Sequence, residues 1–217
     1  MKKPDVRALI EEIGIIPVVN VSMGPARFAA EAVNRAGIHI VEVTATAPGA
    51  LEVISHLRQE ISNMAVGAGS VLDTETAGLC LDAGAVFLTS PGFELAVLEF
   101  AIQKDVVVFP GALTPTEVIT AWKAGADFVK IFPCAQVGGE NYIRAVNASL
   151  PQVPLIASGG VNQTTAFNFI AAGATALGVG GELIPKEALL LRQEERIQEL
   201  ARRFLAAVSK ARAQGPK

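Results

Sequence analysis

The sequence predicts a (β/α)8 barrel, the fold also called a TIM barrel, and three observations point to it. Eight apolar runs have the length of strands, and segments with helical spacing lie between them. The runs are nearly continuous in apolar residues, which is typical of parallel strands buried on both faces. Alanine–glycine pairs recur at intervals of about two βα units, namely Ala36-Gly37, Ala83-Gly84, Ala124-Gly125 and Ala172-Gly173.

The expected elements follow one another in regular order. The strands are expected over residues 15–19, 38–43, 64–68, 86–88, 106–109, 128–132, 154–157 and 176–179. The helices between them are expected over 25–36, 49–61, 74–83, 93–103, 115–124, 139–149 and 163–172. A short helix is expected before the first strand, and a long amphipathic C-terminal helix over 187–212. Residues 214–217 are expected to fray.

Local signals place several helix ends. Thr114, Pro115 and Glu117 form a capping box, with a hydroxyl N-cap, proline at the first helical position and glutamate at the third. The glycine of each alanine–glycine pair suits the left-handed conformation that ends a helix. These signals divide the chain into repeated units of helix and strand.

An open, doubly wound sheet is the alternative arrangement of alternating strands and helices. Eight strands favour the closed barrel, and no Gly-x-Gly-x-x-Gly pattern follows the first strand, which weakens a dinucleotide-binding interpretation. The chain has 217 residues, close to the lower size limit of such barrels, so short loops are expected. Because no linker or charge block marks a boundary, residues 1–217 are expected to form a single domain.

Composition excludes several classes of protein. Apolar residues make up 51% and charged residues 18%, with a formal net charge of -3, so the chain fits neither a disordered protein nor a general nucleic-acid binder. Two cysteines, Cys80 and Cys134, are too few for a disulfide framework. The mean hydropathy is +0.42, yet the sequence contains no apolar run of about 18 residues and no signal-peptide pattern. We expect a cytoplasmic protein without nucleic-acid or membrane partners.

Two charged residues interrupt the apolar runs. Lys130 stands in the sixth expected strand and Glu42 in the second. A buried lysine pairs with a carboxylate, reaches solvent, or loses its charge and becomes a nucleophile that forms Schiff bases with carbonyls. A buried carboxylate serves as a general acid or base, or only as the partner of such a lysine. A catalytic pair and a structural ion pair are both open interpretations at this point.

Glycines at the ends of the last two strands predict an anion site. Gly159 and Gly160 follow the seventh strand, and Gly180 and Gly181 follow the eighth. Many barrels bind phosphate through backbone N–H groups at these two loops, although tight turns use the same residues. Glu182 argues against a phosphate there, because like charges repel.

Metal-dependent and thiol-dependent chemistry are not expected. His39 starts a strand and His56 lies on a helix face, and the sequence shows no cluster of histidines and carboxylates around them. Cys134 follows Lys130 closely but lacks a nearby histidine to activate it. We therefore expect no metal ion and no cofactor.

The chain resembles the bacterial 2-dehydro-3-deoxy-phosphogluconate (KDPG) aldolases and 4-hydroxy-2-oxoglutarate (KHG) aldolases over nearly its whole length. The motifs that carry the resemblance are IIPVV at 15–19, GIHIVEVT at 37–44, GAGSVL at 67–72, SPG at 90–92, PGALTPTE at 110–117, VKIFP at 129–133 and SGGV at 158–161. In this order the set is highly specific, whereas each piece alone is not.

The resemblance implies a class I, metal-free aldolase, usually a homotrimer, that releases pyruvate and an aldehyde such as glyceraldehyde 3-phosphate or glyoxylate. In it Lys130 matches the Schiff-base lysine, and Glu42 matches the glutamate that moves protons. The residues expected to contact the 2-keto acid substrate are Thr44, Thr46, Gly69, Ser70, Pro91, Phe132, Ser158, Gly159, Gly160, Gly180 and Gly181.

The chain departs from the family pattern at three places. Thr46 and Asn20 stand where family members carry an arginine for the substrate carboxylate, so that carboxylate is expected to rest on backbone N–H groups and hydroxyls such as Thr44 and Ser158. Gly181 replaces the serine of the phosphate loop and is followed by Glu182.

Two other functions compete with the aldolase. A phosphate-binding barrel of another class, such as an isomerase or synthase, needs the glycine loops but no reactive lysine. A non-catalytic barrel that only binds a 2-keto acid needs neither turnover nor a covalent adduct. Trapping of pyruvate on Lys130 separates the aldolase from both.

Overall fold

The computed structural model describes residues 1–214 and contains one sheet of parallel strands. The expected fraying of residues 214–217 therefore falls, apart from Gln214, outside the described residues. The strands are β1 (Ile15–Val19), β2 (Ile40–Thr44), β3 (Ala65–Gly69), β4 (Phe87–Thr89), β5 (Val107–Phe109), β6 (Gly111–Ala112), β7 (Val129–Ile131), β8 (Leu155–Ser158) and β9 (Ala174–Val179). Their order in the sheet is β5-β4-β3-β2-β1-β9-β8-β7-β6.

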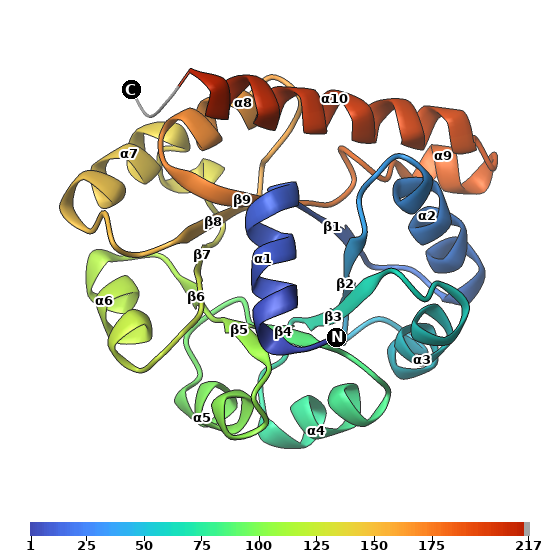
Figure 1. The fold of residues 1–217 in the computed structure, drawn as a ribbon, viewed down its shortest axis with the longest axis horizontal. Coiled ribbons are helices and arrows are strands. Elements are labelled where there is room, and N and C mark those ends of the chain that lie inside the picture. The colour runs from blue at the N-terminus through green and yellow to red at the C-terminus, as the bar shows by residue number, and fades with distance from the viewer. Residues whose placement is uncertain (215–217) are drawn as a thin grey trace.

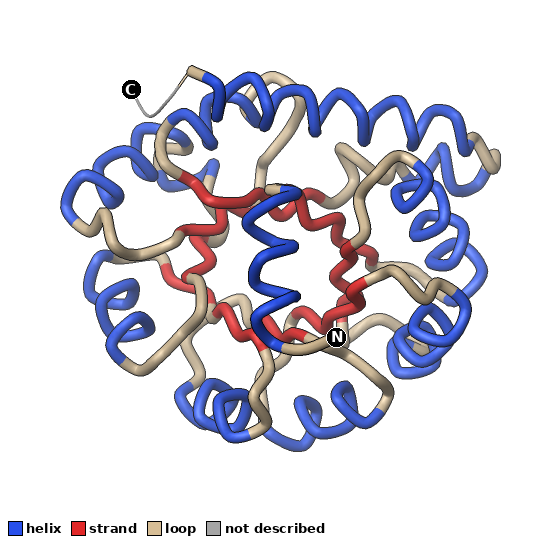
Figure 2. Tube along the Cα trace, in the orientation of Figure 1, coloured by secondary structure: helices blue, strands red, loops and turns tan. Residues whose placement is uncertain are grey.

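The two ends of this order are consecutive in the chain, and this closes the ring. Only Pro110 separates β5 from β6, and proline has no N–H to continue a ladder. The Lys130 N–H donates to the Pro110 carbonyl, and the Asp127 N–H donates to the Val108 carbonyl, so β7 pairs across the interruption. The nine segments thus occupy eight barrel positions, as expected for a (β/α)8 barrel. Figure 2 shows the ring of strands inside a ring of helices.

The helices alternate with the strands along the chain, as expected. They are α1 (Lys3–Ile13), α2 (Met23–Arg35), α3 (Ala50–Glu60), α4 (Thr74–Asp82), α5 (Leu95–Gln103), α6 (Pro115–Lys123), α7 (Glu140–Ser149), α8 (Ala166–Ala171), α9 (Lys186–Leu190) and α10 (Glu194–Ala213), with a 3-10 turn at Ala135–Val137. Within residues 1–214, no helix combines the length and apolar content needed to span a bilayer.

The prediction of a single C-terminal helix over 187–212 was wrong, because this segment forms two helices, α9 and α10. Arg192 adopts a left-handed φ of +49° after α9. The Gln193 N–H donates to the Ala188 carbonyl, and the Arg192 N–H donates to the Leu189 carbonyl. This is the Schellman pattern that ends a helix, formed here without glycine. The break leaves α9 as a short separate helix beside α2 (Figure 1).

Helix α1 covers one end of the barrel, as Figure 1 shows in the view down the axis. Val6, Ile10 and Ile13 are buried on its inner face. Its Lys3 amino group lies 3.0 Å from the buried Asp127 carboxylate, which also accepts the Val108 N–H at 2.9 Å. The helix therefore seals the end of the barrel where the strands begin, and the end where they finish stays available for a site.

Aromatic rings fill part of the barrel interior, beneath the end where the strands finish. The Phe87 and Phe109 rings stack with centroids 5.5 Å apart, and the Phe128 ring meets Phe109 edge-on at 6.2 Å. A Cβ at Gly67 would overlap the Phe87 ring, so glycine makes room for this packing. Gly67 is the register partner of Glu42. Glu42 thus lies next to closely packed apolar side chains.

Candidate active site

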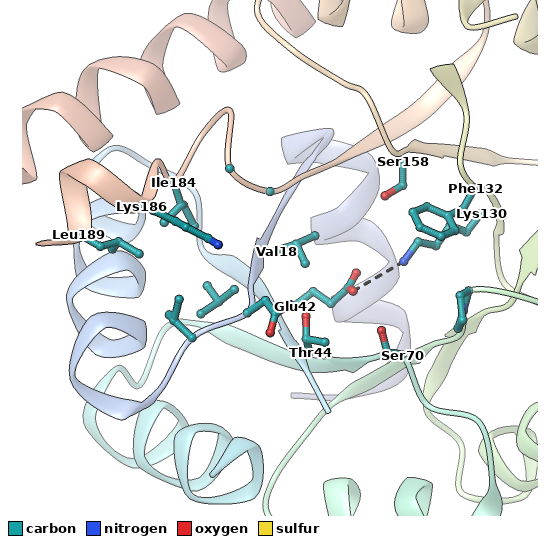
Figure 3. Close-up of a pocket in the computed structure, with 16 residues that line it drawn as sticks. Val18, Glu42, Thr44, Ser70, Lys130, Phe132, Ser158, Ile184, Lys186 and Leu189 are labelled. Atoms are coloured by element: carbon teal, nitrogen blue, oxygen red, sulfur yellow. Dashed lines mark ion pairs between the residues drawn. The ribbon is translucent and has the colours of Figure 1, made fainter. Parts of the chain in front are cut away.

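A cavity of about 360 Å³ opens where the strands of the barrel end (Figure 3). It is lined by Val18, Val19, Asn20, Val21, Glu42, Thr44, Ser70, Pro91, Lys130, Phe132, Ser158, Gly180, Gly181, Ile184, Lys186 and Leu189. These residues come from most of the strands and from the segment after β9. Active sites of such barrels occupy this end.

Lys130 is the central residue of β7, and its strand neighbours fix it in the wall. It is in register with Gly111 of β6 and with Ile156 of β8. Its side chain is 8% exposed, and its amino group lies 5.5 Å from the centroid of the Phe132 ring. The small Gly111 neighbour and the aromatic ring leave the amine facing the cavity rather than bulk water.

Glu42 is held in β2 between β1 and β3. It is in register with Val18 on one side and Gly67 on the other, and its side chain is 4% exposed. Gly69, at the end of β3, has no side chain, and a Cβ there would overlap the Glu42 carboxylate. Gly69 therefore acts through Glu42: it provides the space that the carboxylate occupies.

The two charges meet inside the cavity. The Lys130 Nζ lies 3.6 Å from the Glu42 Oε1, as the dashed line in Figure 3 marks. Each charge offsets much of the cost of burying the other. The separation exceeds the 2.7–3.2 Å range of an N–H···O hydrogen bond. The pair is thus close enough to attract, yet is not locked in a short direct bond.

Hydroxyl groups surround this pair. Thr44 at the end of β2 and Ser158 at the end of β8 are both largely buried, and Figure 3 shows Ser70 with its hydroxyl directed into the cavity. Ser70 has a left-handed φ of +59°, an uncommon conformation outside glycine. A Cβ at Gly178 would stand 2.7 Å from the Ser158 Oγ, so glycine makes room for that hydroxyl.

A second hollow adjoins the first and contains the glycine loops. It is lined by Val18, Phe132, Ser158, Gly159, Gly160, Val161, Gly178, Gly180, Gly181 and Glu182. Gly159 and Gly160 adopt left-handed φ values of +85° and +78°, and a Cβ at Gly160 would overlap Ala135. Glycine adopts both conformations without the steric cost that a side chain would bring. The acidic Glu182 lines this same hollow, as the sequence suggested.

The structure distributes the expected binding residues unevenly. Thr44, Ser70, Pro91, Phe132, Ser158, Gly180 and Gly181 line the main cavity, whereas Gly159 and Gly160 line the second hollow. Gly69 lies behind Glu42. Thr46 is exposed in the turn after β2, outside both sets of lining residues.

Several lining residues were not anticipated from the sequence. Val18, Val19 and Val21 line the cavity from the end of β1, and Ile184, Lys186 and Leu189 line it from the segment after β9. Val18 and Val19 belong to the apolar run at 15–19, which looks like ordinary core, and Val21 follows it closely. Ile184 and Lys186 precede the helix expected over 187–212 and Leu189 lies within it, and no pattern in the sequence marks them as cavity residues.

The histidines and cysteines lie outside the cavity lining. The His39 ring lies 2.6 Å from the Asn34 amide oxygen, and the His56 ring is adjacent to Arg27. Burial raises the pKa of the Cys134 thiol to about 12, which disfavours the reactive thiolate. Among residues 1–214, no three His, Cys, Asp or Glu side chains are grouped so as to hold a metal ion.

Comparison with known proteins identifies the family. The family model described as KDPG and KHG aldolase matches residues 6–200. The chain belongs to the KDPG and KHG aldolase family. It is therefore an aldolase, a carbon–carbon lyase of the Schiff-base class. A 2-dehydro-3-deoxy-phosphogluconate aldolase of Treponema pallidum is 29% identical over 200 residues, which cover 92% of this chain and 95% of that protein.

Solved structures of other aldolases share the fold. A KDPG aldolase of Legionella pneumophila, with pyruvate captured as a covalent carbinolamine intermediate, is 28% identical with a TM-score of 0.82, covering 90% of this chain and 96% of that one. A 2-keto-3-deoxy-6-phosphogluconate aldolase of Zymomonas mobilis with 3-phosphoglycerate is 26% identical with a TM-score of 0.84, covering 93% and 95%.

Proposed function

We propose that this aldolase cleaves a 4-hydroxy-2-keto acid of the KDPG or KHG type through a Schiff base on Lys130, with Glu42 as the general acid and base. The buried pair carries this proposal: an amine and a carboxylate 3.6 Å apart, at the end of the barrel where the strands finish. A Schiff-base nucleophile needs an amine in a desolvated site with a group nearby to move protons. Lys130 and Glu42 meet both requirements.

The reaction begins with attack of the neutral Lys130 amine on the C2 keto carbon. The resulting carbinolamine loses water and gives an iminium, whose cation then draws electrons from the substrate. Glu42 accepts the proton of the C4 hydroxyl, the C3–C4 bond breaks, and its electron pair moves into the iminium to leave an enamine. The aldehyde departs. Glu42 returns a proton to C3, and water hydrolyses the new iminium to release pyruvate and the free amine.

The hydroxyl groups hold the substrate carboxylate in this scheme. Thr44, Ser70 and Ser158 line the cavity around the pair, and each has a hydroxyl that donates a hydrogen bond. Arginine is absent from the lining residues, so neutral donors take over a task that an arginine fork performs well. The other proposed contacts, Pro91 and Phe132, shape the walls of the same space.

We also propose that the glycine loops bind a phosphate weakly. Gly159, Gly160, Gly180 and Gly181 line the second hollow together with Glu182. A carboxylate close to a phosphate dianion raises the energy of the complex. We therefore compare the activity of this enzyme with that of a typical family member on each substrate. The deficit should be smaller for unphosphorylated KHG than for the phosphorylated sugar acids. Retro-aldol kinetics on KDPG, its galactonate epimer and KHG, measured in parallel, test this, and a strong preference for a phosphorylated sugar acid contradicts it.

The proposed activity is tested by pyruvate release from KDPG and KHG. Lys130→Met keeps a long side chain but removes the amine, so turnover of both substrates should fall to background. Lys123→Met, on the exposed end of α6, is the matched control and should retain full activity. An active Lys130→Met enzyme contradicts the proposal.

We further propose that the chain, as a single domain of residues 1–217, works in the cytoplasm as a homotrimer. Membership in this aldolase family, for which the resemblance implies a homotrimer, supports the assembly and the location. Light scattering should give about three times the 22.6 kDa mass of the chain. A monomeric mass in solution contradicts the trimer without affecting the chemistry.

A further inference from the structure

Lys186 lines the active-site cavity but has no part in the chemistry proposed above. It is the first residue of α9, and Figure 3 shows its amino group directed from α9 toward the interior of the cavity. The charged residues among the lining are Glu42, Lys130 and Lys186. Because Glu42 and Lys130 largely offset each other, Lys186 leaves the cavity with a net positive charge.

The backbone that carries Lys186 is well anchored. Leu183 and Ile184 are buried, and their N–H groups both donate to the Gly180 carbonyl at 3.0 Å. Ala188 and Leu189 are buried on the other side of Lys186. These contacts fix the path of the chain before and after Lys186, so its side chain starts from a defined point on the rim.

Stability does not account for a lysine at this position. Within residues 1–214 the Lys186 side chain has no ion pair or hydrogen bond, while the adjacent Glu187 pairs with Arg196 at 2.8 Å. A cation at the first residue of a helix opposes the helix dipole, since cations are favoured at the C-terminal end. The acidic Glu182 lines the second hollow and is absent from the lining of the main cavity.

The two hollows therefore differ in charge. Both hollows are lined by Gly180 and Gly181, but Glu182 lines only the second hollow and Lys186 lines only the main cavity. A substrate joined to Lys130 through C2 must place the far end of its aldehyde half in one of them. A carboxylate or a phosphate at that end is attracted by Lys186 and repelled by Glu182.

We propose that Lys186 is a specificity-determining residue that binds the anionic group at the aldehyde end of the substrate. The proposal rests on the aldolase function proposed above. The group is a carboxylate, or a phosphate that the glycine loops next to Glu182 bind only weakly, since both accept charge-assisted hydrogen bonds from an ammonium. Lys186 thereby supplies, from α9, a positive charge for the substrate in a cavity whose lining contains no arginine.

The test compares Lys186→Met and Lys186→Arg with Lys123→Met, an exposed lysine outside the lining residues that loses the same charge. Three substrates are used: KHG with a carboxylate, KDPG with a phosphate, and unphosphorylated 2-keto-3-deoxygluconate with a neutral end. Lys186→Met should lower kcat/KM about tenfold for a substrate whose anion Lys186 binds, mainly through KM. It should change the neutral substrate less than about twofold.

Two further readouts separate binding of the anion from a structural effect. Lys186→Arg should restore most of the lost kcat/KM, because it keeps the charge. Rising ionic strength should lower kcat/KM of the wild type for the anionic substrate, and this slope should flatten in Lys186→Met. The anionic substrate with the larger loss, KHG or KDPG, identifies the anion as carboxylate or phosphate.

The outcomes distinguish this proposal from the one on which it rests. If borohydride and pyruvate fail to label Lys130 in the wild type, both fall. If labelling succeeds but Lys186→Met affects all three substrates equally, or none of them, only the role of Lys186 is contradicted. If Lys123→Met lowers kcat/KM as much as Lys186→Met does, the role of Lys186 is also contradicted, because the effect then comes from the net charge of the protein.

Discussion

The Lys130 amino group lies 3.6 Å from the Glu42 carboxylate, and both side chains are at most 8% exposed. They come from β7 and β2, strands that are well separated in the order of the sheet. Barrel closure brings them to the same cavity, where each charge compensates the other. Because no short hydrogen bond joins the two groups, the amine is free to attack a carbonyl carbon while the carboxylate stays within reach of its protons.

Glu42→Gln removes the proton carrier while preserving the shape of the side chain. General acid and base catalysis contributes about 100- to 10,000-fold, so kcat for retro-aldol cleavage should fall by that range. Steady-state kinetics on KHG or KDPG measure this, with circular dichroism to confirm folding. A loss below about tenfold would assign Glu42 to charge compensation alone.

Gly69→Ala tests whether Glu42 needs its present position. The added methyl group would overlap the Glu42 carboxylate, and displacement of a catalytic group by about 1 Å costs on the order of 100-fold in rate. Gly24→Ala is the matched control, because a Cβ there meets no atom within 4 Å. Equal activities of the two variants would show that the carboxylate tolerates displacement.

Much of the barrel follows from the sequence. The run at 15–19 coincides with β1, and the capping box at Thr114 and Glu117 begins α6 as expected. Both rest on local physics, namely apolar burial and satisfied N–H groups. The break after α9 was missed because Arg192 takes the left-handed conformation that glycine normally signals.

The site was predictable to the extent that burial makes charge conspicuous. Lys130 and Glu42 stood out because they interrupt apolar strands. Lys186 did not, since an exposed lysine beside a helix is ordinary in sequence and only the fold turns it toward the cavity. Thr46 lies outside both hollows because of the path of the turn after β2. The pattern of apolar strands does not predict the path of a turn.

Glu117 makes the stability of the capped loop depend on pH. Its carboxylate accepts the Leu113 and Thr114 N–H groups at 2.7 and 2.8 Å, and these bonds lower its pKa below the ordinary value of 4.5. A lowered pKa in the folded state stabilises the protein above pH 4.5, and the benefit is lost as pH falls through the lowered value.

Glu117→Gln should therefore be less stable than the wild type at neutral pH, by about 1 kcal/mol as for loss of a helix cap. The gap in free energy of unfolding between the two proteins should narrow below pH 4.5. Urea denaturation at both pH values measures it. If the difference in free energy of unfolding is the same at both pH values, the Glu117 carboxylate does not cause the pH dependence.

Reduction with borohydride in the presence of pyruvate, followed by mass spectrometry of the intact protein and its peptides, tests the Schiff base directly. The wild type should gain one reduced pyruvyl group, located on Lys130, and Lys123→Met should gain the same. Lys130→Met should remain unlabelled. Labelling of another lysine, or an unmodified wild-type protein after reduction with excess pyruvate, would contradict the assignment of Lys130 as the nucleophile.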